Sequence, residues 1–276
     1  MDMAGKTALV TGSTDGVGRV VAARLAEAGA HVLLHGRNEA RGREAVSECE
    51  AKGGSAELVI ADLASLAEVR RLVQAVKDRT DRLHLLINNA GIGSGGPEAQ
   101  REESADGHEL RFAVNHLSGF LLTAELLPLL RASAPARIVN VASAGQQAID
   151  FDDVMITRGY SGTRAYRQSK LAQVMFTLDL AEKLEGSSVT VNCLHPATFM
   201  DTTMVRQWGA APQSTVEEGA EAILNLAISD ELEGRSGLYF NRLRESRANE
   251  QAYDREARRR LWELSVELTG ARFDAA

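Results

Sequence analysis

The chain has 276 residues, of which 44% are hydrophobic and 25% charged, the composition of an ordinary globular protein. Its 31 Lys and Arg against 38 Asp and Glu leave a net charge of −7, which argues against sequence-independent nucleic-acid binding. The N-terminus lacks a signal-peptide profile, no uncharged apolar run approaches the roughly 20 residues of a membrane span, and the two cysteines have neither disulfide nor metal-ligand spacing. We therefore expect a cytoplasmic protein with no membrane span and no metal site.

The first 36 residues have the order strand, glycine-rich turn, helix, strand. An apolar run at 6–11 leads into the turn TGSTDGVG at 11–18, a helical pattern follows at 17–28, and a second apolar run occupies 31–35. The turn of such a βαβ unit can hold a pyrophosphate with its backbone amides and the helix N-terminus. Gly12 suits the tight turn, and Gly16 and Gly18 permit close approach of the backbone. The pattern predicts a dinucleotide site, with an ordinary turn as the alternative.

The end of the second strand bears on which dinucleotide is bound. A carboxylate there would bind a ribose 2′-hydroxyl, whereas an arginine accommodates a 2′-phosphate. No Asp or Glu lies between Val32 and Asn38, but Arg37 does, and Ser13 is available in the turn. We therefore expect NADP(H) to be preferred. NAD(H) stays possible because Asp15 would repel a phosphate, and Arg37 could instead be a solvated loop charge.

Two further helices flank the third strand, which is expected at 55–60. Asn38 is expected to cap a helix at 38–52 and Ser65 to cap another at 66–78. Asp62 follows the strand at its carboxyl end, where ligands bind in sheets of this kind. It either bonds an adenine ring or caps a neighbouring turn.

The apolar run at 83–87 is typical of a strand buried on both faces, and it leads into NNAG at 88–91. These small and polar residues can bond the flanking strands and leave space for a ribose. After a polar loop at 92–106, a long helix is expected at about 107–131, interrupted by Pro128. Asn115 lies in an apolar part of this helix, where an asparagine is either structural or catalytic.

A tyrosine and a lysine share one face of the next long helix. The fifth strand, 137–142, ends at Ser143, and the segment 144–162 is expected to loop over the site. The helix at 161–185 then carries Tyr166 and Lys170 one turn apart. A phenol has a reference pKa of about 10, and an adjacent ammonium favours the phenolate. The pair predicts an acid–base tyrosine whose pKa is lowered by a lysine, with a solvated helix face as the alternative.

The C-terminal part continues the alternation of strands and helices. We expect strands at 188–194 and 237–241, helices at 216–228 and 249–268, and a flexible flap at 197–214. Apolar residues in the flap indicate a moderately apolar substrate, with helix core as the alternative; they are Phe199, Met200, Met204, Val205 and Trp208. No linker or repeat divides the chain, so residues 1–276 are expected to form one α/β domain, a doubly wound parallel sheet of about seven strands.

From Lys6 to about Tyr239 these motifs resemble the short-chain dehydrogenase/reductase family. The resemblance rests on TGSTDGVG at 11–18, Asp62-Leu63, NNAG at 88–91, Asn115, Ser143 and YRQSK at 166–170. VNHLSGFLLT and YFNRLRESRA are similar to the retinol-dehydrogenase-like branch and its bacterial relatives. The family implies an oxidoreductase that interconverts a carbonyl and an alcohol, in a homodimer or homotetramer. The helices at about 107–131 and 161–185 could supply that interface.

The resemblance also implies roles for individual residues. Tyr166 would exchange a proton with the substrate oxygen, which Ser143 would hold. Lys170 would bond the nicotinamide ribose, and Asn115 would hold a helix kink and a relay water. The resemblance and the positions of the strand ends together imply a set of cofactor-binding residues. They are Gly12, Ser13, Asp15, Gly16, Val17, Gly18, Arg37, Asn38, Asp62, Leu63, Asn89, Ala90, Gly91, Tyr166, Lys170, Pro196 and Thr198.

One stretch departs from the family pattern. Pro196 is followed by Ala197 where the family usually has glycine, and Asp201 stands where a threonine is often found. Thr198 and Thr202 are the nearby substitutes, so the threonine that would bond the cofactor is left open. Two other functions remain as alternatives: an NAD(H)-dependent alcohol dehydrogenase of the same fold, and a nucleotide-binding sensor or scaffold without turnover.

Overall fold

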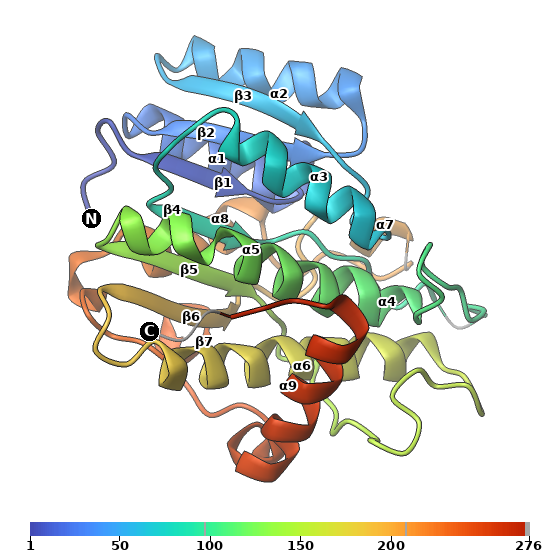
Figure 1. Cartoon of the computed structure of the whole chain (residues 1–276). Coiled ribbons are helices and arrows are strands. Elements are labelled where there is room, and N and C mark those ends of the chain that lie inside the picture. Colours follow the sequence, from blue (N-terminus) through green and yellow to red (C-terminus); the bar gives the residue numbers. More distant parts are fainter. Residues whose placement is uncertain (97, 208, 274–276) are drawn as a thin grey trace.

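The computed structural model describes residues 1–96, 98–207 and 209–273, so the expectation for Trp208 lies outside the described residues. Within this part, eight strands form one sheet in the order β3-β2-β1-β4-β5-β6-β7-β8 (Figure 1). The first seven pair in parallel, and β8 pairs antiparallel with β7. The strands are β1 (Thr7–Val10), β2 (His31–Gly36), β3 (Ser55–Ile60), β4 (Leu85–Asn88), β5 (Ala136–Val141), β6 (Val189–His195), β7 (Tyr239–Asn241) and β8 (Arg244–Glu245).

The α/β fold with a doubly wound, largely parallel sheet is confirmed, but the expected seven strands become eight. The extra strand, β8, has two residues and closes a tight hairpin with β7. A run of two residues carries no alternation of apolar and polar side chains, so periodicity gave no signal for it.

The helices alternate with the strands, as the sequence predicts. They are α1 (Gly16–Glu27), α2 (Glu39–Ala51), α3 (Leu66–Lys77), α4 (Leu110–Phe112), the π-helix η1 (Ala113–Leu117), α5 (Ser118–Ala132), α6 (Gly162–Lys183), α7 (Thr203–Gln207), α8 (Val216–Ile228), the 3₁₀ turns η2 (Asp230–Leu232) and η3 (Glu250–Tyr253), and α9 (Arg255–Thr269). The predicted caps form: Asn38 Oδ1 accepts from the Arg41 amide at 3.0 Å, and Ser65 Oγ from the Glu68 amide at 3.4 Å.

The sheet separates two apolar cores. One core packs α1, α2 and α8 against one face, and the other packs α3, α5 and α6 against the opposite face, with α9 outside α6 (Figure 1). Strands such as β1 and β5 are buried along their whole length because helices cover both faces. The strand order reverses between β1 and β4, so the loops at their carboxyl ends diverge and leave a crevice for a ligand.

The long helix that carries Asn115 is irregular around Asn115, where the resemblance implied a kink, and not at Pro128. It continues through Pro128 to Ala132, so the expected interruption at Pro128 is wrong. The irregularity is the π-helix Ala113–Leu117, which widens the turn around Asn115. The helix also begins at Leu110 rather than near residue 107.

The C-terminal helix α9 covers the outer face of α5 and α6. Trp262 and Phe273 pack against Phe120 and Phe176 with ring centroids 4.5–6.2 Å apart, and Lys183 lies 4.5 Å from the centre of the Trp262 ring. This aromatic cluster occupies helix surface that the sequence suggested as a subunit interface. A copy of the chain could use that surface only by displacing α9.

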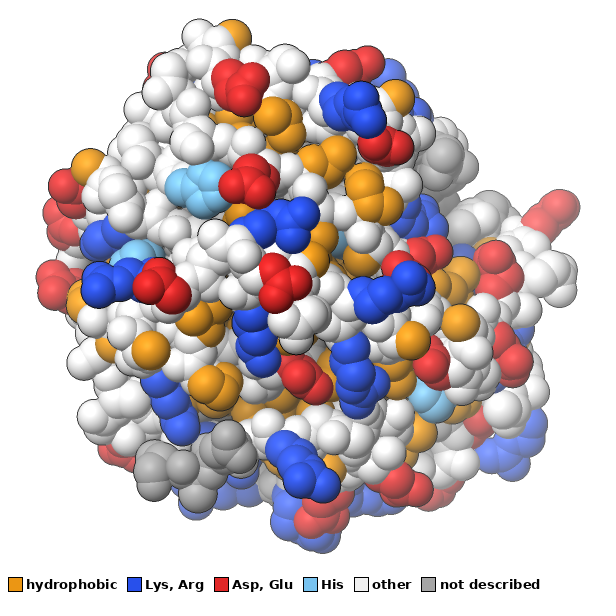
Figure 2. Space-filling view, turned by 45° about the horizontal axis from the view of Figure 1, so that its top comes forward, with side chains coloured by type: hydrophobic (Ala, Val, Ile, Leu, Met, Phe, Trp, Pro, Cys, Tyr) orange, Lys and Arg blue, Asp and Glu red, His pale blue; other side chains and the backbone are white. Residues whose placement is uncertain are grey.

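One helix in the described part of the chain, Leu110–Ala132, is long and apolar enough to cross a membrane. Of its most apolar window, 78% is buried inside the fold, as in the core helix of a soluble protein. On the face in Figure 2, acidic and basic side chains are interspersed rather than gathered by sign.

Candidate active site

The glycine-rich turn sits at the crevice between β1 and β4. Gly12 has φ +64°, and a Cβ atom there would lie 2.8 Å from Ala90 Cα. A Cβ on Gly18 would lie 2.3 Å from the Gly12 carbonyl oxygen. Both positions therefore require glycine, and the turn brings backbone to the N-terminus of α1 without side chains in the way. This cradle fits the pyrophosphate of a dinucleotide.

The Ser13 hydroxyl does not lie where a 2′-phosphate contact requires it. It is fully buried, donates to the Val10 carbonyl at 2.7 Å and accepts from the His35 amide at 3.0 Å. This hydroxyl therefore holds the turn against β2. Thr14, which sequence reasoning passed over, faces the end of β2 instead, because a Cβ on Gly36 would lie 2.5 Å from Thr14 Oγ1.

His35 locks the same turn from β2. Its Nδ1 accepts from the Gly12 amide at 3.2 Å, and its Nε2 lies 3.1 Å from the Ala61 carbonyl oxygen. Burial lowers the pKa of His35 to about 4, so the ring is neutral at pH 7. The neutral tautomer with hydrogen on Nε2 satisfies both bonds and joins the carboxyl ends of β1, β2 and β3.

Two arginines and two aspartates lie around the end of β2. Arg37 is exposed and lies 3.8 Å from an Asp62 carboxylate oxygen, while Arg41 lies 3.4 Å from Asp15. Asp15 Oδ1 also caps α1 by accepting from the Gly16 amide at 2.8 Å. Arg41 was not expected from the sequence, and its charge opposes the repulsion that Asp15 would exert on a phosphate. Asp62 Oδ1 accepts a hydrogen bond from the Ala64 amide at 3.0 Å and so caps a turn, which was one of the two roles expected for it.

The residues after β4 tie the loops of the crevice together. Asn89 Nδ2 donates to the carbonyls of Thr11 and Gly12 at 2.8 and 3.1 Å. A Cβ on Gly91 would lie 3.1 Å from Asn115 Oδ1 and 3.4 Å from Lys170 Nζ. Gly91 therefore sits beside two of the predicted catalytic side chains. Leu63, by contrast, lies buried in the core on the α3 side of the sheet.

Asn115 projects from the π-helix into this cluster. Its Oδ1 accepts from the Ile92 amide at 2.8 Å, and its Nδ2 donates to the Ile92 carbonyl at 3.1 Å and to Ser169 Oγ at 2.9 Å. A cavity of about 10 Å³ adjoins it, lined in part by Thr11, Asn88 and Gln173. Asn88 Oδ1 is buried there and finds no hydrogen-bond partner in the described residues. The cavity has room for about one water.

Hydrogen bonds fix both the side chain and the backbone carbonyl of Ser143. Its Oγ accepts from the Gly145 amide at 3.0 Å, and its carbonyl accepts from Gln146 Nε2 at 2.7 Å and from the Tyr239 hydroxyl at 3.3 Å. Ser143 and Tyr166 converge at Gly145, because a Cβ atom there would lie 3.5 Å from Ser143 Oγ and 3.8 Å from Tyr166 Cε1. Two residues that are 23 positions apart in the sequence therefore lie close together, as the resemblance implied.

The predicted tyrosine–lysine pair forms, but its electrostatics differ from the expectation. Lys170 Nζ lies 5.9 Å from the centre of the Tyr166 ring and donates to the Val141 carbonyl at 2.9 Å and to Gln173 Oε1 at 2.8 Å. Burial raises the pKa of Tyr166, and the hydrogen bond to Ser143 opposes the rise. Burial also lowers the pKa of Lys170 to about 7. The pKa of Tyr166 in the protein alone therefore moves opposite to the expectation, because desolvation dominates and Lys170 is not among the groups that shift it.

The segment after β6 closes the crevice from the other side. Pro196 is buried, and Thr198 Oγ1 lies 3.1 Å from His195 Nε2. Thr202 approaches the glycine-rich turn, since a Cβ on Gly16 would lie 3.3 Å from its Cγ2. Thr203, in α7, donates to Asp15 at 2.9 Å. The threonines near the turn are thus Thr202 and Thr203.

The apolar residues of the expected flap divide into two groups. Met200 packs with Val17 in the core between α1 and α8, which matches the alternative reading as core. Met204 in α7 is 39% exposed, and a Cβ on Gly93 would lie 3.0 Å from its Cγ. Met204 and the loop after β4 therefore face each other.

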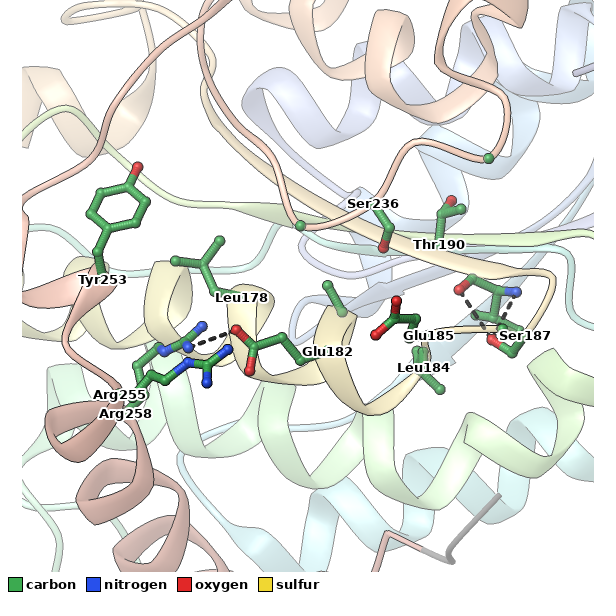
Figure 3. Close-up of a pocket in the computed structure, with 15 residues that line it drawn as sticks. Leu178, Glu182, Leu184, Glu185, Ser187, Thr190, Ser236, Tyr253, Arg255 and Arg258 are labelled. Carbon is green, nitrogen blue, oxygen red and sulfur yellow. Dashed lines mark hydrogen bonds and ion pairs between the residues drawn. The ribbon is translucent and has the colours of Figure 1, made fainter.

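A separate groove of about 610 Å³ lies at the other end of α6 (Figure 3). Leu178, Glu182, Thr190 and Arg255 are among its lining residues, and Glu182 pairs with Arg258. Glu182 is twelve residues beyond Lys170 on the helix, about 18 Å at a rise of 1.5 Å per residue. The groove is therefore not part of the catalytic cluster.

Comparisons with known proteins find relatives from one family. A family model for the short chain dehydrogenases matches residues 6–213. Human retinol dehydrogenase 14 is 39% identical over 300 residues, covering 97% of this chain and 87% of that protein. Human retinol dehydrogenase 12 is 34% identical over 287 residues, covering 99% of this chain and 89% of that protein.

Solved structures are similar over most of the chain. An uncharacterized protein from Mycobacterium paratuberculosis superposes with a TM-score of 0.81 and 30% identity, covering 99% of this chain and 96% of its own. The Pseudomonas aeruginosa RhlG/NADP active-site complex superposes with a TM-score of 0.71 and 31% identity, covering 87% of this chain and 95% of its own.

Proposed function

The chain belongs to the short-chain dehydrogenase family, in its retinol-dehydrogenase-like branch, and on that premise we propose that it is an NADP(H)-dependent oxidoreductase. It interconverts a carbonyl and an alcohol on a moderately apolar small molecule. The observation that supports the proposal is the convergence of three side chains: a Cβ on Gly145 would lie 3.5 Å from Ser143 Oγ and 3.8 Å from Tyr166 Cε1, and Lys170 Nζ lies 5.9 Å from the Tyr166 ring centre.

Each catalytic side chain has a role in moving or holding one proton. The bound nicotinamide supplies the hydride chemistry. Tyr166 gives its hydroxyl proton to the carbonyl oxygen in reduction and removes the alcohol proton in oxidation. Ser143 holds that oxygen beside the Tyr166 hydroxyl. Lys170 has two of its three N–H donors bonded within the protein, which leaves one for the nicotinamide ribose.

Asn115 holds the loop that lines the cofactor crevice and, with the cavity beside it, supports a buried water. Burial keeps Lys170 titratable near neutral pH, since its pKa is about 7. A water beside Gln173, which accepts from Lys170, would extend the path for a proton away from Tyr166. Asn88 Oδ1 lines the same cavity and has no hydrogen-bond partner in the described residues, which supports a water there.

The preference for NADP(H) rests on the charges around β2. Arg37 is an exposed cation just after the strand, Arg41 lies beside Asp15, and Thr14 lies against Gly36 at the strand end. Guanidinium groups suit a 2′-phosphate because they donate paired hydrogen bonds. The NADP complex of the similar Pseudomonas aeruginosa protein supports this choice. Asp15 favours the alternative, an NAD(H)-dependent dehydrogenase.

The moderately apolar substrate is supported by Met204, which faces the loop after β4, and by the names of the retinol dehydrogenases. The chain is proposed to act in the cytoplasm as a single domain, 1–276. A homodimer or homotetramer remains part of the proposal, formed through a face other than the helix surface that α9 covers.

The test is NADPH oxidation by the purified protein with a panel of aliphatic and aromatic aldehydes and ketones. The proposal expects turnover that rises with the apolar size of the carbonyl compound and that Tyr166→Phe abolishes. Tight NADPH binding without turnover of any compound would point to a sensor or scaffold. Faster reaction with NADH would point to the NAD(H)-dependent enzyme.

A further inference from the structure

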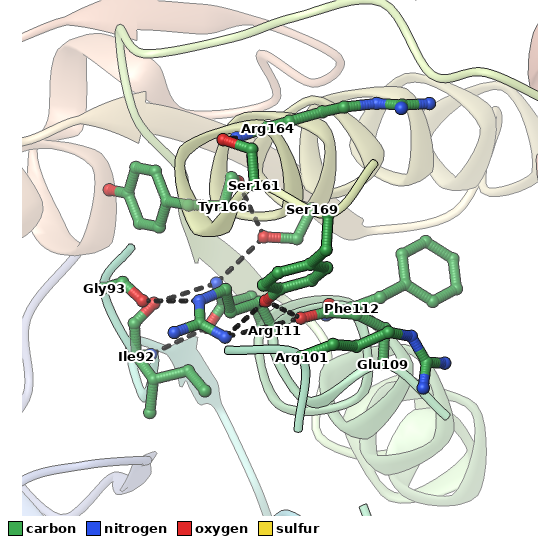
Figure 4. A network of polar contacts seen from close by, with 12 residues as sticks. Ile92, Gly93, Arg101, Glu109, Arg111, Phe112, Ser161, Arg164, Tyr166 and Ser169 are labelled. Carbon is green, nitrogen blue, oxygen red and sulfur yellow. Dashed lines mark hydrogen bonds and ion pairs between the residues drawn. The ribbon is translucent and has the colours of Figure 1, made fainter. Parts of the chain in front are cut away.

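A buried arginine next to the catalytic cluster has no part in the mechanism above. Arg111 is 3% exposed. Its Nε donates to the Gly93 carbonyl at 3.0 Å and its Nη1 donates to the Tyr160 hydroxyl at 2.7 Å (Figure 4). These two partners belong to the loop after β4 and to the segment just before the catalytic helix α6. The guanidinium therefore joins two segments that are far apart in the sequence.

A buried carboxylate completes the network. The Tyr160 hydroxyl donates to Glu109 Oε1 at 2.9 Å, and Glu109 Oε2 accepts from the Phe112 amide at 2.7 Å. Glu109 is 1% exposed and lies 3.5 Å from Arg111. Burying two charges costs desolvation energy that the ion pair alone repays poorly. The polar partners on three segments indicate that the network serves to fix their geometry.

The network continues into the catalytic cluster through adjacent residues. Gly93, held by Arg111, directly follows Ile92, which Asn115 holds by two hydrogen bonds. Asn115 also donates to Ser169 Oγ at 2.9 Å, and Ser169 Oγ donates to the Tyr166 carbonyl at 2.7 Å (Figure 4). A continuous path of contacts therefore runs from the Arg111 guanidinium to the backbone of Tyr166, the fifth residue of α6.

We propose that Arg111 is a positioning residue: with Glu109 and Tyr160 it fixes the loop at 91–95 relative to the start of α6, and so sets the distance from Tyr166 to the bound substrate. The proposal rests on the proposed function. Arg111 acts through Gly93 and Tyr160 and touches neither substrate nor cofactor. Gly93 also faces Met204, so a shift of this loop moves a wall of the substrate site as well.

The variant Arg111→Met keeps an unbranched side chain as long as the part of arginine from Cβ to Nε, and it removes the guanidinium donors. We expect kcat to fall about 100-fold, because a misplacement of about 1 Å at the reacting groups costs that much. The Kd for NADPH should stay within about twofold, since the glycine-rich turn and the end of β2 hold the adenosine half. Arg111→Lys, which restores a charge and one donor, should recover part of the lost kcat.

Arg258→Met is the matched control. Arg258 is 5% exposed and pairs with Asp179 and Glu182, near the far end of the same helix α6. Its loss removes an equally buried arginine without touching the 91–95 loop. We expect kcat within threefold of the wild type. Equal losses of kcat in the two methionine variants would mean that Arg111 contributes only to the stability of the fold, which would overturn the proposal.

Hydrogen exchange tests the proposal without turnover. The Ile92 amide is bonded to Asn115, so peptides covering 89–96 should exchange at least tenfold faster in Arg111→Met and unchanged in Arg258→Met. Unchanged exchange in both variants would overturn the proposal. Should the wild type reduce no carbonyl compound, the proposed function fails, and the exchange result still decides whether Arg111 fixes the loop.

Tyr160→Phe is a second variant that tests the same proposal if Arg111→Met does not fold. It removes the hydroxyl that joins Arg111 to Glu109 and leaves their ion pair in place. We expect a tenfold fall in kcat with unchanged NADPH binding, and faster exchange in the peptides covering 89–96. Wild-type kcat and wild-type exchange in this variant would overturn the proposal.

Discussion

Asp15, at the N-terminus of α1, accepts a hydrogen bond of 2.9 Å from Thr203, which lies 188 residues further along the chain. This contact ties the short helix α7, which would border the proposed substrate site through Met204, to the turn that would hold the cofactor. The two ends of the site are therefore joined through a carboxylate that also caps α1 and faces Arg41.

Asp15→Asn separates the charge of this residue from its hydrogen bonds. Asparagine caps a helix as well as aspartate does and still accepts from Thr203, so the free energy of unfolding should change by less than about 1 kcal/mol. Removal of the negative charge should tighten NADPH binding several-fold and leave NADH binding nearly unchanged. Asp81→Asn, an equal charge change in an exposed loop before β4, is the control in fluorescence titrations. Equal effects of Asp15→Asn on both cofactors would contradict the assignment of the 2′-phosphate to this region.

Arg37→Ala should weaken NADPH binding far more than NADH binding. A charge-assisted hydrogen bond contributes about 1.5–3 kcal/mol. Arg37 is 67% exposed, so the lower figure applies, which is about a tenfold rise in the Kd for NADPH. Arg43→Ala, an exposed arginine on α2 that pairs with Glu39, should change neither Kd. Titrations at one fixed salt concentration check both, and a parallel loss for the two cofactors would refute the role of Arg37.

His35 should make the protein less stable in mild acid. Its pKa is about 4 in the fold and about 6.5 in the unfolded chain, so between these values the unfolded chain binds more protons. The stabilisation is complete above pH 6.5 and is lost as the pH falls towards 4, with a total of about 3 kcal/mol. Urea unfolding at pH 7 and pH 5 measures it. The His35→Gln variant should show a smaller difference between the two pH values; an identical difference would assign the effect elsewhere.

Phe120→Ala should uncouple α9 from the body of the protein. Phe120 is 1% exposed and packs against Phe176, Trp262 and Phe273 at 5.0–5.2 Å between ring centroids. Truncating a buried phenylalanine costs about 3–5 kcal/mol. Leu243→Ala, at a position that is 50% exposed, should cost less than about 0.5 kcal/mol. Urea unfolding of both variants checks this, and similar losses would show that the aromatic cluster does not anchor α9.

The parts that sequence predicted well are those with a local signal. The βαβ start followed from apolar runs on both sides of a glycine-rich turn, and the caps Asn38 and Ser65 followed from side-chain chemistry. The meeting of Ser143 with Tyr166 followed from the resemblance, because no local pattern joins residues so far apart. In each of these predictions, the type of the residue restricts the conformations or hydrogen bonds that it can form.

The parts that sequence missed depend on packing between distant segments. Ser13 reads as an exposed hydroxyl, yet the fold turns it inward against β2 and leaves Thr14 facing the strand end. A π-helix has no periodic signature, so the helix irregularity at Asn115 was implied only by the resemblance, and the interruption expected at Pro128 does not occur. The network of Arg111 with Tyr160 spans 49 residues, and three-residue or four-residue spacing gives no sign of it.

The most direct test of the proposed mechanism is the transfer of deuterium to a carbonyl substrate from NADPH that carries deuterium at both C4 positions of the nicotinamide, followed by mass spectrometry of the alcohol. Wild-type protein should place one deuterium on the carbinol carbon. Tyr166→Phe should bind NADPH normally yet form the labelled alcohol at least 100-fold more slowly, since general acid–base catalysis contributes about 10²–10⁴-fold. Unlabelled alcohol, or equal rates in the two proteins, would contradict the proposal that Tyr166 supplies the proton in a hydride-transfer reaction.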